Sequence, residues 1–205
     1  MYDISRHLLA RRRSVYATTG VALVVLLVAG IAAYYMMMPP GQAQGSPNPQ
    51  DSSVIASNFR VLSQGHTDVC ADLGNQQANA NYINSLTDNF YLQGSCCFPM
   101  DYSHYVSQTN GLKNYSDIPI VPQNPYNVSA SHAKEMMSFA TLTMTPAQQA
   151  VYDNAAKASS EGPCCCKCWA WYAHEGLAKA LISQYGWSAQ QIANIWSLED
   201  CCGGP

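Results

Sequence analysis

The longest uninterrupted apolar stretch lies near the start of the chain. Residues 19–38 contain no charged side chain and are rich in valine, leucine, alanine and methionine. A helix rises about 1.5 Å per residue, so this stretch can cross a hydrocarbon layer of roughly 30 Å. Four arginines precede it, and the positive-inside rule keeps such a flank in the cytoplasm. The pattern predicts a cytoplasmic N-terminus at residues 1–14, a single-pass anchor in the cell membrane at 15–38, and an extracytoplasmic main domain.

A cleaved signal peptide is the alternative for this stretch, with Gly41-Gln42-Ala43 as its cleavage site. The apolar run is longer than the roughly 7–15 residues of a signal-peptide core, which favours a retained anchor. Residues 39–53 are rich in Pro, Gly, Gln and Ser, a composition typical of a flexible tether without a core. Residues 54–205 then form the exported domain.

Helical signals predominate in the exported domain, and strand signals are scarce. Thr145-Pro146-Ala147-Gln148 and Ser188-Ala189-Gln190-Gln191 are capping boxes, each of which predicts the start of a helix. Gly186 is well placed to cap the preceding helix in the left-handed conformation. The fold class is therefore predicted as all-α, a transmembrane helix followed by a helical domain. The helices are expected over residues 75–92, 102–115, 129–141, 145–160, 163–185 and from 188 onward, with an extended, proline-rich connector at 118–127.

Charge is sparse and uneven, which narrows the function classes. Only 11% of the residues are charged, and those after residue 50 include six basic and twelve acidic side chains. A surface for nucleic acid needs clustered lysine and arginine, so nucleic-acid binding is excluded. The sequence has no phosphate loop, no nucleophile elbow and no βαβ pattern for a thioredoxin-type site. No histidine is convincingly placed beside a cysteine nucleophile, and we do not expect an enzyme.

Cysteine is the residue type that suggests a function. Of the nine cysteines, four lie within five positions, and two more precede the last three residues of the sequence. Thiolates bind soft metals such as Cu(I), Zn or an Fe–S cluster. Cu(I) fits closely packed cysteines best, whereas structural zinc usually takes two separated Cys/His pairs and fits less well. The candidate metal ligands are Cys164, Cys165, Cys166, Cys168, Cys201 and Cys202.

The geometry of these ligands depends on where the next helix begins. If it begins at Pro163, Cys164, Cys165 and Cys168 share one side of its first turn, where free N–H groups and the helix dipole favour thiolates. Tyr172 and Glu175 fall on the same side. Either could hydrogen-bond to a ligand, although an ion pair between Glu175 and Lys179 is the alternative. His174 is turned about 120° from Cys168 and is expected to face solvent or another helix.

Disulfides are the main alternative to a metal, because exported domains are where disulfides persist. The candidates for pairing are Cys70, Cys96 and Cys97, with members of the later clusters as partners. Nine is an odd number, so at least one thiol would remain if the chain pairs only with itself.

A short motif adds a family resemblance. Pro163, Cys164, Cys166 and Cys168 match a P-C-Y-C-G-C motif, with Cys165 in place of Tyr and Lys167 in place of Gly. The segment resembles exported, membrane-anchored proteins named for that motif, over about the last third of the chain. The resemblance implies metal binding, often of copper. If Cys164, Cys166 and Cys168 are the ligands, the segment must be a loop, since a helix would scatter them.

The sequence therefore predicts a membrane-anchored extracytoplasmic protein that binds a soft metal, Cu(I) before zinc, for acquisition, delivery or sequestration. Its partners would be the membrane and a metal-receiving protein. The alternative is a structural or accessory subunit of a membrane protein complex, stabilised by disulfides. A thiol–disulfide oxidoreductase is a third option, which would need an exposed thiol pair of low pKa.

Overall fold

The computed structural model describes residues 49–205 except 66, 68–75, 161 and 205. The chain divides into two units, Met1–Asn48 and Pro49–Pro205. The cytoplasmic segment, the anchor and most of the tether that the sequence predicts lie in the first unit, outside the described residues. No helix within the described part of the chain is long and apolar enough to cross a membrane.

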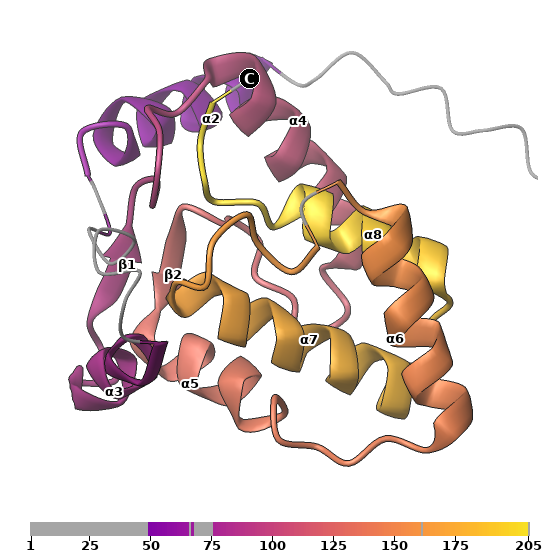
Figure 1. Ribbon diagram of the computed structural model, residues 1–205. Coiled ribbons are helices and arrows are strands. Elements are labelled where there is room, and N and C mark those ends of the chain that lie inside the picture. The colour runs from indigo at the N-terminus through magenta and orange to yellow at the C-terminus, as the bar shows by residue number, and fades with distance from the viewer. Residues whose placement is uncertain (1–48, 66, 68–75, 161, 205) are drawn as a thin grey trace, which may run out of the picture. The chain divides into compact units, whose positions relative to one another are not determined.

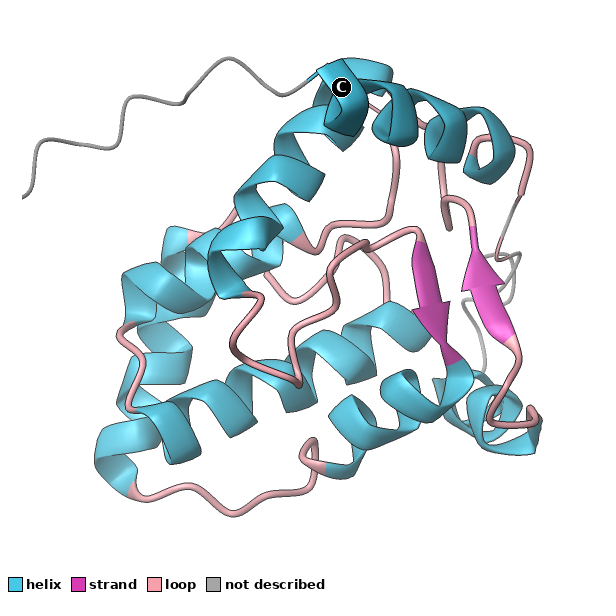
Figure 2. Cartoon of the chain, turned by 180° about the vertical axis from the view of Figure 1, so that it is seen from behind, coloured by secondary structure: helices cyan, strands magenta, loops and turns pink. Residues whose placement is uncertain are grey.

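The second unit is mostly helical, in agreement with the predicted class (Figure 1). Two short strands, β1 (Tyr91–Gln93) and β2 (Asn127–Ser129), form an antiparallel pair that the sequence did not indicate, with Leu92 opposite Val128 (Figure 2). The described helices are α2 (Pro49–Leu62), α3 (Gln76–Ser85), α4 (Tyr102–Leu112), α5 (Ala130–Ser138), α6 (Pro146–Ala158), α7 (Trp169–Tyr185) and α8 (Ala189–Leu198), with a 3-10 turn, η2 (Lys113–Tyr115), after α4.

Local signals fix the ends of the later helices as predicted. Thr145 accepts a hydrogen bond from the backbone of Gln148 and forms a complete capping box at α6, and Ser188 does the same at α8. Gly186 ends α7 at φ 67°, a left-handed conformation that glycine adopts without steric cost. Residues close in sequence determine these three boundaries, so the sequence alone was enough to predict them.

Three boundaries differ from the prediction. Helix α2 begins at Pro49, inside the expected tether, with proline at a position where its missing N–H costs nothing. The helix expected over 75–92 ends at Ser85, and the chain then continues to β1. Helix α7 begins at Trp169 and not at Pro163, because Cys168 has an extended backbone, with φ −82° and ψ −172°, and caps the helix. Residues 163–168 are therefore a loop, called here the cluster loop.

Helix α7 provides the centre of the core. Leu177, Leu181 and Ala173 on this helix are fully buried. Gly176 allows α5 to approach, because a Cβ at this position would overlap the carbonyl group of Met136. Helix α8 packs against α4, α6 and α7. The tryptophans 169, 187 and 196 are buried in this core, and Trp171 is partly buried against it.

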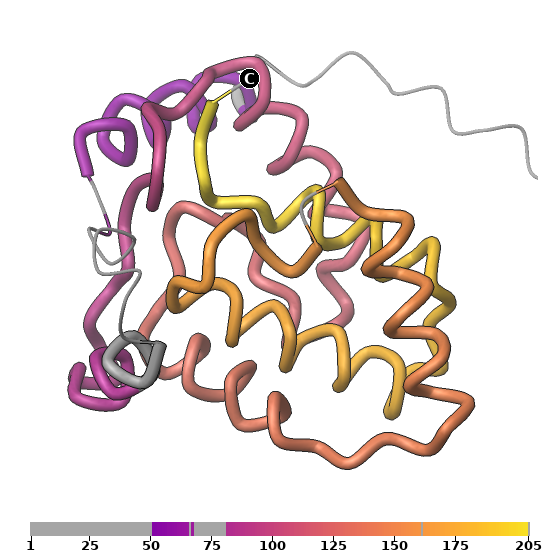
Figure 3. The backbone as a smooth tube through the Cα atoms, viewed as in Figure 1, coloured from indigo at the N-terminus to yellow at the C-terminus, as the bar shows by residue number. Residues whose placement is uncertain are grey.

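The chain after α8, residues 199–204, is called here the cysteine tail, and it runs beside residues 94–100 (Figure 3). The N–H of Cys96 donates to the carbonyl of Cys201 at 2.9 Å, and the N–H of Phe98 donates to the carbonyl of Cys202 at 2.7 Å. Gly203 lies at φ 76°, and a Cβ there would overlap the carbonyl oxygen of Phe98. The pairing requires glycine at this position, and it fixes the tail cysteines next to Cys96 and Cys97.

Candidate metal centre

Three segments that are distant in sequence bring their cysteines to one place. The cluster loop, residues 94–100 and the cysteine tail meet at the N-terminal end of α7. No disulfide joins any of the eight cysteines that these segments carry. Cys70 lies outside the described residues. The eight residues, called here the sulfur cluster, are Cys96, Cys97, Cys164, Cys165, Cys166, Cys168, Cys201 and Cys202.

The buried part of the sulfur cluster surrounds Cys202 and Cys96. The Sγ of Cys164 lies 3.4 Å from that of Cys202 and 3.7 Å from that of Cys168. The Sγ of Cys96 lies 3.7 Å from Cys202 and 3.8 Å from Cys201. All five side chains are almost completely removed from solvent. Sulfur atoms from all three segments are therefore in contact inside the fold.

The outer part of the sulfur cluster reaches the surface. The Sγ of Cys97 lies 3.6 Å from Cys166 and 3.9 Å from Cys165. Cys165 is exposed, Cys97 and Cys166 are partly buried, and the Sγ of Cys165 is only 2.8 Å from that of Cys202. Cys165 thus links the exposed thiols to the buried ones.

The sulfur atoms form sets of three. In the described part of the chain, four groups of three sulfur atoms, called here the triads, have all their members within 4.8 Å of one another. The triads are Cys96–Cys164–Cys168, Cys96–Cys97–Cys202, Cys97–Cys165–Cys166 and Cys164–Cys165–Cys202. The sulfurs of Cys96, Cys164 and Cys202 also lie within this limit of one another, and each of them belongs to two of the triads.

His174 ties the cluster loop to α7. It is buried, and its Nδ1 lies 2.8 Å from the carbonyl oxygen of Pro163. A carbonyl only accepts, so Nδ1 carries the proton and donates it. Burial lowers the pKa of His174, because the charged ring would lose its hydration. The expectation that this ring faces solvent or another helix was wrong: it faces the loop that carries four of the eight cysteines.

Crowding prevents the eight thiols from ionising together. Hydrogen bonds from Cys164 and then Cys96 lower the pKa of Cys202, which favours its thiolate form over that of its neighbours. Its hydrogen bonds to Cys164 and other thiols raise the pKa of Cys96, and burial adds to the effect. Hydrogen bonds to Cys166 and Cys168 likewise raise the pKa of Cys164. A bound cation would replace these shared protons.

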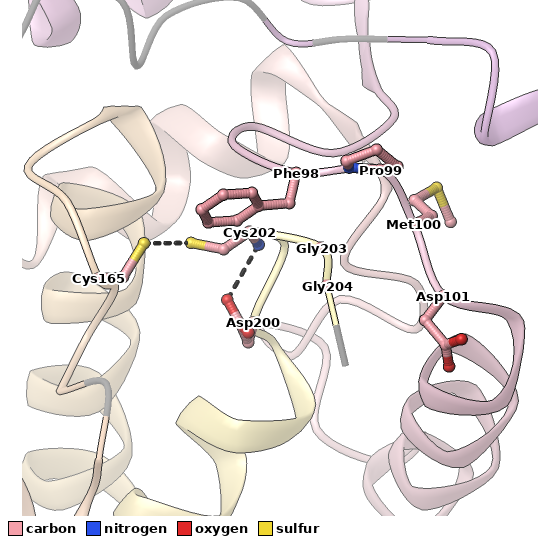
Figure 4. A pocket seen from close by; sticks show the side chains of 9 residues that line it. All are labelled: Phe98, Pro99, Met100, Asp101, Cys165, Asp200, Cys202, Gly203 and Gly204. Carbon is pink, nitrogen blue, oxygen red and sulfur yellow. Dashed lines mark hydrogen bonds between the residues drawn. The ribbon is translucent and has the colours of Figure 1, made fainter.

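A pocket of about 630 Å³ opens onto two of the sulfur atoms (Figure 4). Cys165 and Cys202 line it together with Phe98, Met100 and Asp200. The backbone N–H of Cys202 donates to Oδ1 of Asp200 at 2.9 Å, which holds the turn of the tail in place. The remaining lining residues are Pro99, Asp101, Gly203 and Gly204. The pocket gives a small solute access to a sulfur atom that is otherwise buried.

The six ligand candidates from the sequence all lie in the sulfur cluster, although Cys201 belongs to none of the triads. Cys96 and Cys97 were considered only for disulfides, and they are free thiols within two triads each. Their adjacency, which repeats that of Cys201 and Cys202, is the signal that could have identified them. Glu175 forms the ion pair with Lys179, at 2.9 Å, that was the alternative to a role beside the ligands. Desolvation raises the pKa of Tyr172, and the nearby Glu175 raises it further. No cysteine contributes to this shift.

The fold and the site define a small helical domain with a group of free thiols at the start of its central helix. Comparison of the chain with protein-family models, with curated proteins and with solved structures found no match. Its function must therefore be inferred from the sulfur cluster.

Proposed function

We propose that this protein binds Cu(I) through its sulfur cluster, for acquisition, delivery or sequestration of the metal. The observation that carries the proposal is the convergence of eight free thiols, from three segments, into triads of sulfur atoms within 4.8 Å of one another. Thiolates are soft ligands, and they select soft ions such as Cu(I).

The size of the triads supports a three-coordinate ion. A metal about 2.3 Å from each of three sulfurs places those sulfurs about 4 Å apart at the corners of a triangle. Neighbouring sulfurs in the triads are mostly separated by such distances, from 3.4 Å for Cys164 and Cys202 to 3.9 Å for Cys97 and Cys165. The contact between Cys165 and Cys202, at 2.8 Å, would have to widen when the metal binds.

The number of sulfurs in each set favours copper over zinc. Structural zinc is almost always held by four ligands in a tetrahedron. In the described part of the chain, each of the triads brings three sulfurs within 4.8 Å of one another, the number of ligands that a three-coordinate ion needs. Cu(I) is stable with two or three thiolates, so a group of three sulfurs supplies all the ligands that it needs.

The surroundings support retention of a soft cation. The N-terminus of α7 directly follows Cys168, and its free N–H groups and dipole stabilise negative sulfur. Burial of Trp169 beside this end shields the inner thiols from water. The proposal places the domain outside the cell membrane, on the basis of the apolar stretch at residues 19–38 and the arginines before it.

Anaerobic metal titration tests the proposal. The reduced protein is titrated with Cu(I) in the presence of the competing chelator bicinchoninate, and bound copper is measured by mass spectrometry of the intact chain. We expect copper to be retained against the chelator, and alkylation of the cluster cysteines to be blocked until copper is stripped. Failure to retain copper, or tighter retention of zinc in a parallel titration, would overturn the assignment.

Two variants test whether copper binds at the triads and not simply to any cysteine. Cys164→Ser with Cys202→Ser removes two members of one triad and should weaken copper retention sharply. Cys201→Ser is the matched control, because Cys201 is as buried as Cys164 but belongs to no triad. Equal loss in both proteins would show that the triads are not the binding sites.

A further inference from the structure

The triads are not independent sites, because they share their corners. Each triad has one sulfur in common with at least two of the other three triads. Two residues, Cys166 and Cys168, contribute to one triad only. The sulfurs that belong to two triads each are those of Cys96, Cys97, Cys164, Cys165 and Cys202.

A shared sulfur is a chemically reasonable bridge. A thiolate has more than one lone pair, and it can bind two soft cations at once. Cu(I) carries a single charge, so adjacent ions repel each other weakly, and the bridging thiolate between them offsets that repulsion. A divalent ion in each of four such adjacent sites would bring together twice the positive charge.

We propose that the sulfur cluster binds four Cu(I) ions as one polynuclear copper–thiolate centre, an inference that rests on the proposed copper function. Each ion occupies one triad and is bound to three sulfurs. The five shared cysteines bridge pairs of ions, and Cys166 and Cys168 are terminal ligands. Cys201 is not a ligand; it packs against Cys96, with their sulfurs 3.8 Å apart.

Charge and proton balance are consistent with this centre. Binding as seven thiolates requires the seven cysteines to give up one proton each to solvent, and no electron is transferred because copper enters and stays as Cu(I). Seven thiolates and four monovalent cations leave an excess of negative charge. The N-terminus of α7, which begins at Trp169, contributes partial positive charge beside it.

The capacity of the centre bears on the role of the protein. A carrier that passes on one ion needs one site with an accessible ligand. Four ions that share buried sulfurs suit sequestration, because releasing any one of them disturbs the bridges to the others. The pocket beside Cys165 and Cys202 is then the route by which copper reaches the sulfur atoms.

Native mass spectrometry after anaerobic titration with Cu(I) acetonitrile complex, followed by removal of weakly bound copper with bicinchoninate, tests the inference. We expect a single loaded species with four copper ions, formed without much of the one-, two- and three-copper forms. The loaded protein should also emit visible light under ultraviolet excitation, as solvent-shielded polynuclear copper–thiolate centres do. Saturation below four ions overturns the inference, while saturation at one to three ions leaves the proposed copper function intact. Absence of retained copper overturns both.

Variants test which sulfurs bridge. Cys202→Ser removes a corner of two triads and should retain at most two ions, whereas Cys168→Ser removes a corner of one triad and should retain at most three. Cys201→Ser should still bind four. Circular dichroism checks that each variant is folded, and the stoichiometry of the unmodified chain decides the matter if a variant is not. Four ions in the Cys202→Ser protein would overturn the bridging assignment.

Discussion

The imidazole of His174 donates a hydrogen bond from Nδ1 to the carbonyl oxygen of Pro163, 2.8 Å away and inside the core. This contact joins the first residue of the cluster loop to the second turn of α7. The contact holds the loop that carries four of the cysteines, and it does so through the backbone of Pro163 and not through a sulfur atom.

Replacing His174 with leucine should loosen the cluster loop. The variant keeps a side chain of similar size but leaves the buried carbonyl of Pro163 unpaired, which costs roughly 1–3 kcal/mol of folding stability. Groups that orient metal ligands typically change metal affinity by about 10–100-fold when they are lost. We expect a decrease in copper affinity of that order, measured by chelator competition.

His132→Leu is the matched control for this experiment. The Nε2 of His132, on α5, also contacts a backbone carbonyl at 3.0 Å, but that carbonyl belongs to Ile120, which is in none of the three segments that form the sulfur cluster. It should lower stability without changing copper affinity. A similar drop in affinity in both variants would contradict a specific role for His174.

The pairing of the cysteine tail gives a second prediction. Gly203→Ala introduces a Cβ that overlaps the carbonyl of Phe98 and also strains a backbone at φ 76°. We expect the tail to detach, which exposes Cys201 and Cys202 to alkylation and removes copper binding in the triads that contain Cys202. Gly186→Ala shares the strain, at φ 67°, but meets no atom within 4 Å. It should cost about 1–2 kcal/mol of stability and leave copper binding unchanged.

Access to the thiols gives a third prediction, tested on the reduced, metal-free protein. Among the eight cluster cysteines, only Cys165 is exposed, so a bulky maleimide–polyethylene glycol should label Cys165 alone. Iodoacetamide is small enough to enter the pocket and should also modify Cys202, whose pKa is lowered by hydrogen bonds from Cys164 and Cys96. Peptide mapping identifies the labelled residues. Labelling of Cys168 as quickly as Cys165 would contradict the buried arrangement.

The pH dependence of stability should report on Glu199. This side chain is completely buried, and neither of its carboxylate oxygens has a hydrogen-bond partner among the described residues. Burial therefore raises its pKa well above the ordinary value of 4.5. At pH below 4.5 both folded and unfolded chains hold the proton, and no stability is lost. Above that pH only the unfolded chain ionises, so stability falls by about 1.4 kcal/mol per pH unit until the raised pKa is reached.

Glu199→Gln removes this loss, because glutamine stays neutral at every pH. The variant should match the parent in urea unfolding at pH 4 and be more stable at pH 7.5, with metal-free reduced protein in both cases. Glu135→Gln, an exposed change on α5, controls for the loss of one charge. Equal stability of Glu199→Gln and the parent at pH 7.5 would show that Glu199 is ionised in the folded chain.

Helix ends could be read from the sequence where neighbours in sequence determine them. The capping boxes at Thr145 and Ser188 and the left-handed Gly186 satisfy backbone groups within a few residues, and all three were predicted correctly. The start of α7 could not be read in this way. Proline at position 163 is a good local signal for a helix, but contacts of the cluster loop with His174 and with the tail, made across the fold, outweigh it.

Only part of the candidate site could be predicted, because contacts across the fold complete it. The density of cysteines at positions 164–168 and 201–202 indicated their importance by itself. Cys96 and Cys97 belong to the sulfur cluster because residues 94–100 pair with the cysteine tail. This pairing consists of backbone hydrogen bonds between residues about a hundred positions apart in the sequence. The spacing of apolar and polar residues does not predict such a pairing. The need for glycine at position 203 is apparent only once Phe98 is known to lie beside it.

The backbone hydrogen bond between Cys96 and Cys201 joins two distant segments of the chain, which has a consequence for biosynthesis. During translation the four cysteines of the cluster loop leave the ribosome before the tail, whose Cys202 contacts both Cys164 and Cys165. A nascent chain at that stage carries reactive thiols whose partners have not yet been made. A chain that met oxidant or copper at that stage could be trapped in a wrong arrangement. If the protein binds copper as proposed, correct maturation requires that the metal be withheld until the cysteine tail has been made.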